Sequence, residues 1–307
     1  MRVLLTGPSG FIGRHAIPYL QTAGCELHTV DIRPLDDAVT GLSHHAVDLL
    51  DARRVRELMT EIRPSHLLHF AWCVTPGAFW TSPDNVRWLQ ASLDLVAAFL
   101  DCGGQRSVIA GTCAEYDWTG GEILREDHTP VRPSSLYGAS KAALQLVHAR
   151  LASLAGSSFA WGRIFHLYGP FEPESRLVPS VIRSILGGQA ARCTHGRQVR
   201  DFMHVDDVAR AFVALLQGSA EGVVNIATGQ GVQIAEVTRR IADILGRPDL
   251  LCLGALPEAA SDPPTLVADA RRLHSLGFVP AYSLDGGLRQ TINWWTQRSA
   301  VQSDVVC

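Results

Sequence analysis

A tyrosine and a lysine lie four residues apart in the segment Tyr137-Gly138-Ala139-Ser140-Lys141. Residues at this spacing share one face of a helix. A phenol with a pKa near 10 transfers protons poorly at neutral pH, but an ammonium about 5 Å away favours the phenolate by about 3 kcal/mol, or roughly two pKa units. The pair therefore predicts proton transfer by Tyr137 with help from Lys141. The alternative is an ordinary pair on an exposed helix surface.

Thr112 follows a predicted core strand, in the segment Ala110-Gly111-Thr112-Cys113-Ala114-Glu115-Tyr116. Strand ends converge on the ligand in a parallel sheet, so its hydroxyl could bind the same substrate oxygen as Tyr137. The alternative for Thr112 is a helix or turn cap.

Three glycines occur in Thr6-Gly7-Pro8-Ser9-Gly10-Phe11-Ile12-Gly13, between the first predicted strand and the first predicted helix. Such glycines allow a tight turn and a close approach of the backbone to a pyrophosphate, which the helix N-terminus then binds. The segment predicts a dinucleotide site, in which Lys141 and Tyr137 would also contact the nicotinamide ribose. The residues expected around the dinucleotide are Gly7, Ser9, Gly10, Phe11, Ile12 and Gly13, together with Phe70 and Ala71 at the end of a later strand.

Asp31 ends the second predicted strand, 18 residues after Gly13. A carboxylate there can accept hydrogen bonds from the adenosine ribose and would repel a 2′-phosphate, which favours NAD over NADP. Arg33 leaves NADP open, because its guanidinium could bind that phosphate. Asp48 and Leu49 are expected to border the adenine, with a plain turn as the alternative.

Alternating strands and helices must position these residues in the first half of the chain. This rhythm predicts an α/β protein of the Rossmann type, with a doubly wound parallel sheet and helices on both faces. The predicted strands are Val3–Thr6, Glu26–Asp31, His66–Phe70 and Ser107–Ala110, and the predicted helices are Phe11–Ala23, Ala52–Arg63 and Asn85–Leu100.

The second half is less regular and predicts a smaller C-terminal substrate lobe that is interleaved with the first domain. We place the dinucleotide-binding domain at residues 1–165 with a returning segment near 198–222, the lobe at 166–197 and 223–298, and a mobile tail at 299–307. Strands are predicted at Phe159–Phe165 and Val223–Ile226, and helices at Leu136–Leu154, Leu177–Leu186, Asp206–Leu216, Ile234–Leu245 and Asp285–Trp295.

The composition excludes several classes of partner. A net charge of -3 and a pI near 6.4 give no global attraction to nucleic acid or to an anionic membrane. No run of residues approaches the roughly 20 apolar positions of a membrane span, and the first strand is too short for a signal peptide. The seven cysteines are scattered without a C-x-x-C pair, so we expect free thiols in a reducing cytoplasm and no metal site.

Together these residues resemble the extended short-chain dehydrogenase/reductase family, in its branch of nucleotide-sugar epimerases, dehydratases and 4-ketoreductases. The resemblance covers Met1 to about Trp295. Beyond the glycine turn and the Tyr–Lys pair, it rests on three later segments that are similar to family motifs: Arg163-Ile164-Phe165-His166-Leu167-Tyr168-Gly169-Pro170, Arg200-Asp201-Phe202-Met203-His204-Val205-Asp206-Asp207 and Asn225-Ile226-Ala227-Thr228-Gly229.

The resemblance implies a catalytic triad of Thr112, Tyr137 and Lys141, and a nucleotide sugar bound by the smaller lobe. His166, Arg176 and Arg200 are then the expected contacts to the substrate, together with Thr112. The resemblance also implies a homodimer formed through Asn85–Leu100 and Leu136–Leu154.

The sequence departs from the family at several places. Dehydratases of the family usually have Asp-Glu directly after the catalytic threonine, where this chain has Cys113 and Ala114, so dehydration in that manner is not expected. Glu115 would face the other way if the strand continued. An asparagine often found beneath the catalytic lysine aligns with Trp88, so the support for Lys141 must come from elsewhere.

Two further departures concern the expected phosphate contacts. His166 replaces an asparagine and could be either a phosphate contact or a packed imidazole. An arginine often found in the C-terminal lobe has no match in residues 257–262, which leaves Arg176, Arg200 and Arg271 as candidates. Arg200 is the strongest of them because its motif is intact, and a surface ion pair is the expected role of Arg271.

Three functions remain open at this stage. The first is a 4-ketoreductase of a nucleotide-linked 4-keto-deoxyhexose, which the segments around Gly111–Trp118 and Phe165–Val178 favour. The second is an NAD-dependent 4-epimerase, which Asp31 favours and which would use the same triad. The third is a regulator that binds a dinucleotide without catalysis, although such regulators typically lack the Tyr–Lys pair. Trp72, Trp80 and Trp118 could stack on the substrate or pack within their own loops.

Overall fold

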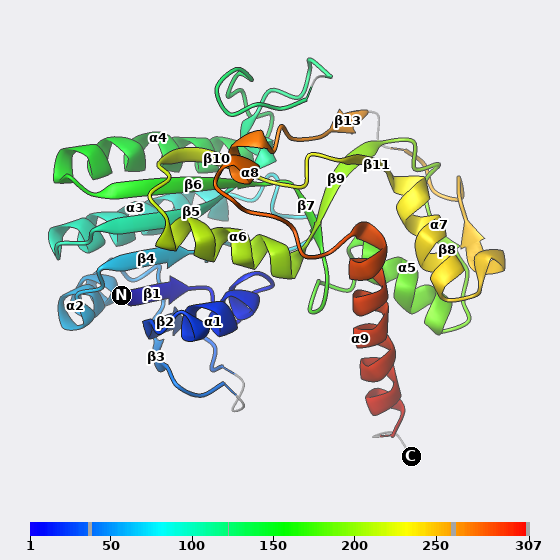
Figure 1. The fold of residues 1–307 in the computed structure, drawn as a ribbon, viewed down its shortest axis with the longest axis horizontal. Helices are drawn as coiled ribbons and strands as arrows, with labels where there is room; N and C mark the ends of the chain where they lie inside the picture. Colours follow the sequence, from blue (N-terminus) through cyan, green and yellow to red (C-terminus); the bar gives the residue numbers. More distant parts are fainter. Residues whose placement is uncertain (36–38, 122, 259–261, 305–307) are drawn as a thin grey trace.

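A seven-stranded parallel sheet forms the centre of the larger half (Figure 1). The computed structural model describes residues 1–35, 39–121, 123–258 and 262–304. The strand order is β10-β6-β5-β4-β1-β2-β3, so the order reverses between β1 and β4. Sheets of this kind bind ligands outside the carboxyl ends of the strands at that switch point. The strands are β1 (Arg2–Thr6), β2 (Glu26–Asp31), β3 (Ser43–Ala46), β4 (His66–His69), β5 (Arg106–Thr112), β6 (Ser158–Ile164) and β10 (Gly222–Ile226).

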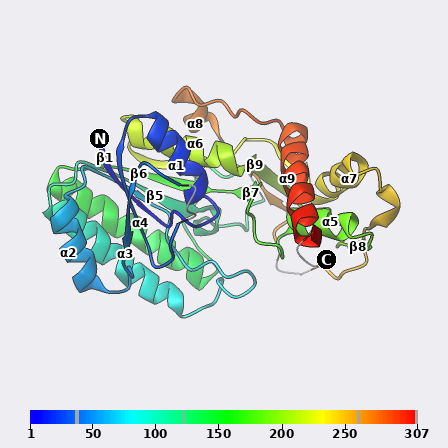
Figure 2. The ribbon, with the colours of Figure 1, turned by 90° about the horizontal axis from the view of Figure 1, so that it is seen from below.

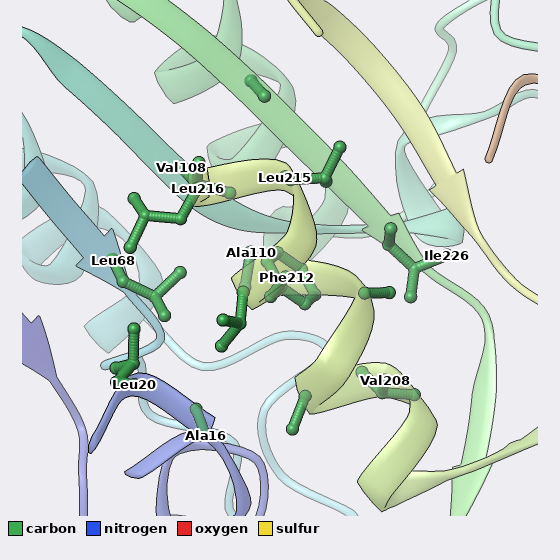
Figure 3. Packing of buried hydrophobic residues seen from close by; sticks show 14 of the residues in the cluster. Ala16, Leu20, Leu68, Val108, Ala110, Val208, Phe212, Leu215, Leu216 and Ile226 are labelled. Atoms are coloured by element: carbon green, nitrogen blue, oxygen red, sulfur yellow. The ribbon is translucent and has the colours of Figure 1, made fainter. Parts of the chain in front are cut away.

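Helices cover both faces of this sheet (Figure 2). The helices α2 (Ala52–Ile62), α3 (Asp84–Asp101) and α4 (Leu136–Ala155) pack on one face, and α1 (Gly13–Thr22) and α6 (Val205–Gln217) pack on the other. Because both faces are covered, β5 is buried along its whole length. Phe212 of α6 lies over the sheet near Ala110 (Figure 3), and Gly162 makes room for it, since a Cβ there would lie 2.5 Å from Phe212 Cζ.

The smaller lobe has its own strands and its own apolar core (Figure 1). Its helices are α5 (Leu177–Leu186), α7 (Ile234–Ile244) and α9 (Leu284–Asp304). Its strands are β7 (His166–Tyr168), β9 (Val199–His204), β11 (Gly231–Gln233) and β13 (Thr265–Leu266), with the short pair β8 (Ala191–Arg192) and β12 (Leu251–Cys252). Short helical segments are η1 (Cys113–Glu115), η2 (Pro248–Leu250) and α8 (Arg271–Ser275).

The chain returns to the large sheet at a different place from the predicted one. Strand β10 pairs with β6, so residues 222–226 belong to the large sheet, although residues from 223 onward were predicted to lie in the lobe. Strand β9 pairs instead with β7, β11 and β13 in the lobe, although it falls within the predicted returning segment 198–222. Sequence periodicity shows a strand but does not show its neighbours.

The predicted mobile tail is also partly wrong, because α9 continues to Asp304. The apolar spacing that predicted the helix ends at Trp295, but Ser299 stays in the helix and its hydroxyl donates to the Trp295 carbonyl at 2.9 Å. Residues 305–307 lie outside the described residues.

Two of the sequence motifs connect segments that are far apart in the chain. Asp201 of β9 is completely buried, and its carboxylate accepts hydrogen bonds from Thr228 N at 2.9 Å and Gly229 N at 2.8 Å. Asn225 of β10 accepts a hydrogen bond from the Tyr116 hydroxyl at 2.7 Å. The Asp201 contacts fasten the lobe to the segment that follows β10, and the Asn225 contact ties β10 to the segment that follows β5.

Candidate active site

A cavity of about 730 Å³ lies at the carboxyl ends of the central strands, next to the smaller lobe. Its walls combine both halves of the molecule, because residues of the glycine-rich turn and of β9 line the same space. Of the predicted site residues, only Ser9 is absent from the lining; those present are Gly7, Gly10, Phe11, Ile12, Gly13, Asp31, Arg33, Asp48, Leu49, Phe70, Ala71, Thr112, Tyr137, Lys141, His166, Arg176 and Arg200.

The glycine-rich turn between β1 and α1 is too tight for side chains. Gly7 has a φ of +68°, and a Cβ there would lie 2.9 Å from Ala71 N. A Cβ on Gly13 would lie 2.1 Å from Gly7 O. Helix α1 starts at Gly13, so the positive end of its dipole lies beside the bare backbone of the turn. This cradle fits the pyrophosphate of a dinucleotide.

Asp31 ends β2 in the cavity wall, and its neighbours hold its carboxylate in place. Ser9 Oγ donates to Asp31 Oδ2 at 2.5 Å, and Arg33 N donates to Oδ1 at 3.1 Å. Ser9 therefore orients Asp31 instead of lining the cavity. The Arg33 guanidinium is largely exposed and lies 3.6 Å from the same carboxylate. Asp48 Oδ1 accepts from Leu50 N at 2.9 Å, while Leu49 is buried, so this turn forms a rigid part of the wall.

Helix α4 brings Tyr137 next to the end of β5. The Ser135 side chain caps the helix by accepting from Gly138 N. A Cβ on Gly138 would lie 2.2 Å from Ala114 O, so this glycine permits the close approach. The Thr112 side chain is close enough to Tyr137 to lower the pKa of the phenol, and Lys141 Nζ donates to Ala110 O at 2.8 Å. The three predicted catalytic side chains thus line the same cavity.

Burial controls the protonation of this group. It raises the pKa of Tyr137, and the Thr112 hydrogen bond lowers it only partly. Burial also lowers the pKa of Lys141 to about 7, against the charge of Glu115, which raises it. The expectation that Lys141 brings the pKa of Tyr137 below its usual value is therefore wrong for the protein without ligands, because desolvation of the phenolate is the largest influence on this pKa and raises it.

Glu115 serves the structure of this corner. The strand ends at Thr112, and the chain turns into η1, with the Thr112 hydroxyl accepting from Ala114 N at 3.2 Å. Thr112 is thus both a cap and part of the cavity wall. Glu115 is fully buried, pairs with Arg163 at 2.7 Å and accepts from Trp161 Nε1 at 2.9 Å.

Cys113 and Ala114 occupy the two positions after Thr112 and provide no acid for water elimination. The Cys113 thiol lines the cavity, but burial raises its pKa to about 12. Ala114 carries no functional group. The corner can therefore move a proton through Tyr137 but offers no acid and base pair of the dehydratase kind.

The lobe contributes the three polar residues predicted for it, His166, Arg176 and Arg200, to the cavity lining. His166 is neutral, because burial lowers its pKa to about 3, and its Nδ1 has no hydrogen-bond partner in the described part of the chain. Arg200 is buried, and its guanidinium pairs with Asp262 at 2.5 Å. Arg176 occupies the N-cap position of α5, without a capping hydrogen bond from its side chain. Two arginines and an unpartnered imidazole nitrogen in one wall could bind a diphosphate.

Arg271 does not contribute to this wall. Its guanidinium is largely exposed and pairs with Asp269, with Arg271 Nε 3.0 Å from Asp269 Oδ1. The cavity lining does not include Arg271. The expected surface ion pair is therefore confirmed.

Sequence reasoning missed Glu172, which also lines this cavity. Its side chain is only 7% exposed, and Oε2 has no partner among the described residues. Burial raises the pKa of Glu172 to about 8. Phe171, with a φ of +68°, packs against Arg14 and Trp294 and fixes the loop that presents it. The only available signal was an acid between two prolines after Tyr168-Gly169-Pro170.

Aromatic side chains surround Tyr137. The ring centroids of Phe79, Trp80 and Trp72 lie 4.9, 5.9 and 6.5 Å from that of Tyr137. These three rings and Trp118 also line the cavity. The tryptophans therefore both pack against neighbouring side chains and face the space that a ligand would occupy. Among the helices of the described residues, none has the length and apolar character of a membrane span, and no group of three or more His, Cys, Asp or Glu there could hold a metal.

Comparison with known proteins places the chain among enzymes of nucleotide sugars. The sequence matches the NAD dependent epimerase/dehydratase family over residues 3–227. The UDP-glucose 4-epimerase of Azospirillum brasilense is 29% identical, over 98% of this chain and 93% of the relative. The UDP-glucose 4-epimerase of Thermus thermophilus, solved with NAD, has a TM-score of 0.87 and 28% identity, covering 96% of this chain and 99% of that one. MoeE5, solved with UDP-glucuronic acid and NAD, is 32% identical with a TM-score of 0.80, covering 97% and 100%.

Proposed function

Because the chain belongs to the NAD dependent epimerase/dehydratase family, we propose that it is an NAD-dependent 4-epimerase of a nucleotide sugar. The relatives named UDP-glucose 4-epimerase favour this activity over the 4-ketoreductase that the sequence motifs favoured first. Family membership makes the chain an enzyme that uses NAD, so a regulator without catalysis is not supported.

The observation that carries the proposal is the meeting of Tyr137, Thr112 and Lys141 in a cavity that also contains the glycine-rich turn and Arg200. The turn fits the pyrophosphate of NAD, and Asp31 fits the adenosine ribose. When bound, NAD would supply reversible hydride transfer at C4 of the sugar. The arginines of the lobe would hold the substrate diphosphate.

The chain's own residues would then move the proton. Tyr137 takes the proton of the sugar 4-hydroxyl and later returns it, while Thr112 holds the same oxygen by a hydrogen bond. The ammonium of Lys141 stabilises the phenolate form of Tyr137 that accepts this proton. Because burial raises the pKa of Tyr137 in the protein alone, its phenolate would also depend on the positive charge that an oxidised nicotinamide would supply when bound.

A 4-ketoreductase of a deoxysugar nucleotide is the second candidate. The rings of Trp72, Phe79 and Trp80 surround Tyr137 with apolar surface, which suits a sugar that carries few hydroxyl groups. This candidate uses the same triad but consumes one reduced cofactor for each turnover.

One assay separates the two candidates. Purified protein is incubated with UDP-glucose and NAD, and separately with 4-keto-deoxyhexose nucleotides and NADH, and both sugars and cofactor are quantified. Formation of the C4 epimer without net change of cofactor supports the proposal. Stoichiometric loss of NADH with the keto sugars would support the reductase instead, and neither reaction with a panel of UDP-, dTDP-, GDP- and CDP-sugars would overturn both.

We propose further that two copies pair through α3 and α4, which pack side by side on the large sheet. Several apolar side chains on these helices are exposed to solvent. Leu154 is 87% exposed and Leu146 is 61% exposed, and Val86 and Val147 are also exposed. Sedimentation at several concentrations should give the mass of a dimer, and Leu146→Glu should shift it toward the monomer. A monomer at all concentrations would contradict the pairing.

A further inference from the structure

Lys141 is the only lysine in the chain; the other 26 of its 27 Lys and Arg residues are arginine. Its side chain is 3% exposed. Nζ has one hydrogen-bond acceptor, the Ala110 carbonyl at 2.8 Å, and no carboxylate of the described residues lies within ion-pair distance. A buried ammonium with so little support is unfavourable, so another group must stabilise it.

The face of Trp72 supplies that support. Lys141 Nζ lies 3.9 Å from the centroid of the Trp72 ring. An indole face attracts a cation more strongly than any other side-chain ring, and most strongly where water is excluded. The same ring meets Tyr137 edge to face, with centroids 6.5 Å apart. Trp72 thus contacts both members of the pair.

The orientation of the Trp72 ring is fixed from behind. Its Nε1 donates to Asn85 Oδ1 at 2.9 Å, and Asn85 Nδ2 donates to Phe79 O at 2.7 Å and Ser82 O at 2.9 Å. Asn85 is 1% exposed. Trp88, at the position where related enzymes often have an asparagine, lies with its ring centroid 6.4 Å from that of Trp72. Trp72 thus contacts both Lys141 and Trp88.

We propose that Trp72 is the positioning residue of Lys141, and that its indole face, with the Ala110 carbonyl, holds the ammonium where Tyr137 needs it. The inference rests on the proposed function only in giving Lys141 a role beside Tyr137. Among the described residues, the ammonium is thus held by an indole face and one backbone carbonyl, without a hydrogen-bond acceptor from α3.

The other groups around Lys141 leave this role to Trp72. Glu115 of η1 acts on the ammonium only at a distance and raises the pKa of Lys141. His69 of β4 is neutral, because burial lowers its pKa to about 3, and His148 of α4 is neutral because burial lowers its pKa to about 4. Tyr137, one turn earlier on α4, stays protonated without ligand because burial raises its pKa.

The single lysine permits a direct test that needs neither substrate nor cofactor. Protein labelled with ¹³Cε-lysine gives one lysine side-chain signal, and its shift against pH reports the pKa of Lys141. Trp72→Leu should lower the midpoint by about one pH unit or more, because the charged form loses its partner, and Trp72→Phe should lower it less. Trp118→Leu is the matched control: this indole lines the same cavity, donates to Cys113 O at 2.8 Å, and should leave the midpoint unchanged.

An unchanged midpoint in folded Trp72→Phe and Trp72→Leu proteins would overturn the inference, and so would an equal shift in the Trp118 control. If Trp72→Leu fails to fold, Trp72→Phe and Asn85→Leu, which leaves the indole N–H unpaired, carry the test. In the epimerase assay, the alkaline limb of kcat should move to lower pH by the same amount, and Trp72→Phe should retain more activity than Trp72→Leu. Absence of epimerase activity would refute the proposed function but would leave the titration result standing.

Discussion

Two buried glutamates can be compared, one in each half of the molecule. Glu115 lies in η1, directly after β5 of the dinucleotide-binding half, and Glu172 lies in the loop between β7 and α5. Glu115 receives hydrogen bonds from Arg163, from Trp161 and from the backbone N of Thr112. Glu172 Oε2 receives none within the described ranges. A buried polar group without a partner is expensive to retain, so it points to a ligand.

Two histidines show the same contrast. His69 of β4 contacts Thr6 Oγ1 at 2.6 Å and Ser92 Oγ at 2.9 Å, so both ring nitrogens are satisfied. His166, at the start of β7, has an unpartnered Nδ1 where the structure is described, and its ring lines the cavity. His69 is thus satisfied within the dinucleotide-binding half, while the loop and the lobe present an unpartnered carboxyl oxygen and an unpartnered imidazole nitrogen in residues that line the cavity.

The largest expected effect is the loss of catalysis on substitution of Tyr137, in the dinucleotide-binding half. Tyr137→Phe removes the hydroxyl that transfers the proton and should lower kcat by about a hundredfold or more, while NAD affinity stays nearly unchanged. Tyr116→Phe is the control: it removes a buried hydroxyl that bonds Asn225, outside the cavity, and should preserve turnover. Measured epimerisation rates and NAD titrations check both. A near-normal rate for Tyr137→Phe would remove that residue from its role.

A loss of stability is expected next, when the buried carboxylate of Glu115 loses its ion-pair partner Arg163. Arg163→Met leaves Glu115 buried without its cation, and the free energy of unfolding should fall by about 3–5 kcal/mol. Arg183→Met breaks the exposed pair with Glu174 and should change the stability by less than about 1 kcal/mol. Urea denaturation measures both. Equal small losses would mean that the buried pair is no more important than a surface one.

Glu172 should make the protein less stable as the pH rises. Its pKa is raised from a usual value of 4.5 to about 8, so the folded state holds a proton that the unfolded state releases. Its contribution is fully present below pH 4.5 and is lost as the pH rises to about 8. Glu172→Gln should remove this loss and raise the unfolding free energy at pH 8 by on the order of 3 kcal/mol.

Urea denaturation of Glu172→Gln at pH 5, 7 and 8.5 checks this, with Glu174→Gln as the control. Glu174 is half exposed and pairs with Arg183, so its substitution should not change the pH dependence. Parallel pH curves for the Glu172→Gln and unsubstituted proteins would show that Glu172 is charged at neutral pH.

The smallest expected effect concerns the choice of cofactor. Asp31→Ser removes the carboxylate that repels a 2′-phosphate and frees Arg33, so the ratio of NADP to NAD affinity should rise about tenfold. The double variant Asp31→Ser/Arg33→Gln should lose most of that gain. Titration of both dinucleotides gives the ratios. An unchanged ratio in the single variant would mean that Asp31 does not contact the ribose.

Local signals explain why much of the site could be predicted. The glycine-rich turn and the helix that carries Tyr137 and Lys141 depend on residues adjacent in sequence, and both lie where the sequence predicts them. Partners across the fold were out of reach, because no spacing along the chain reveals that Ser9 orients Asp31 or that Trp72 faces Lys141. The pairing of β10 with β6 was missed for the same reason.

The sequence by itself determined the α/β order, the turn that fits a pyrophosphate and the four-residue spacing of Tyr137 and Lys141, since backbone geometry and helix periodicity are local properties. Tertiary structure alone decided the protonation of the groups that this chemistry needs. Burial raises the pKa of Tyr137 and lowers that of Lys141 to about 7. Glu115 and Glu172 are both buried, but among the described residues only Glu115 has hydrogen-bond partners for both carboxylate oxygens. Desolvation depends on every atom packed around a group, and only the folded chain brings those atoms together.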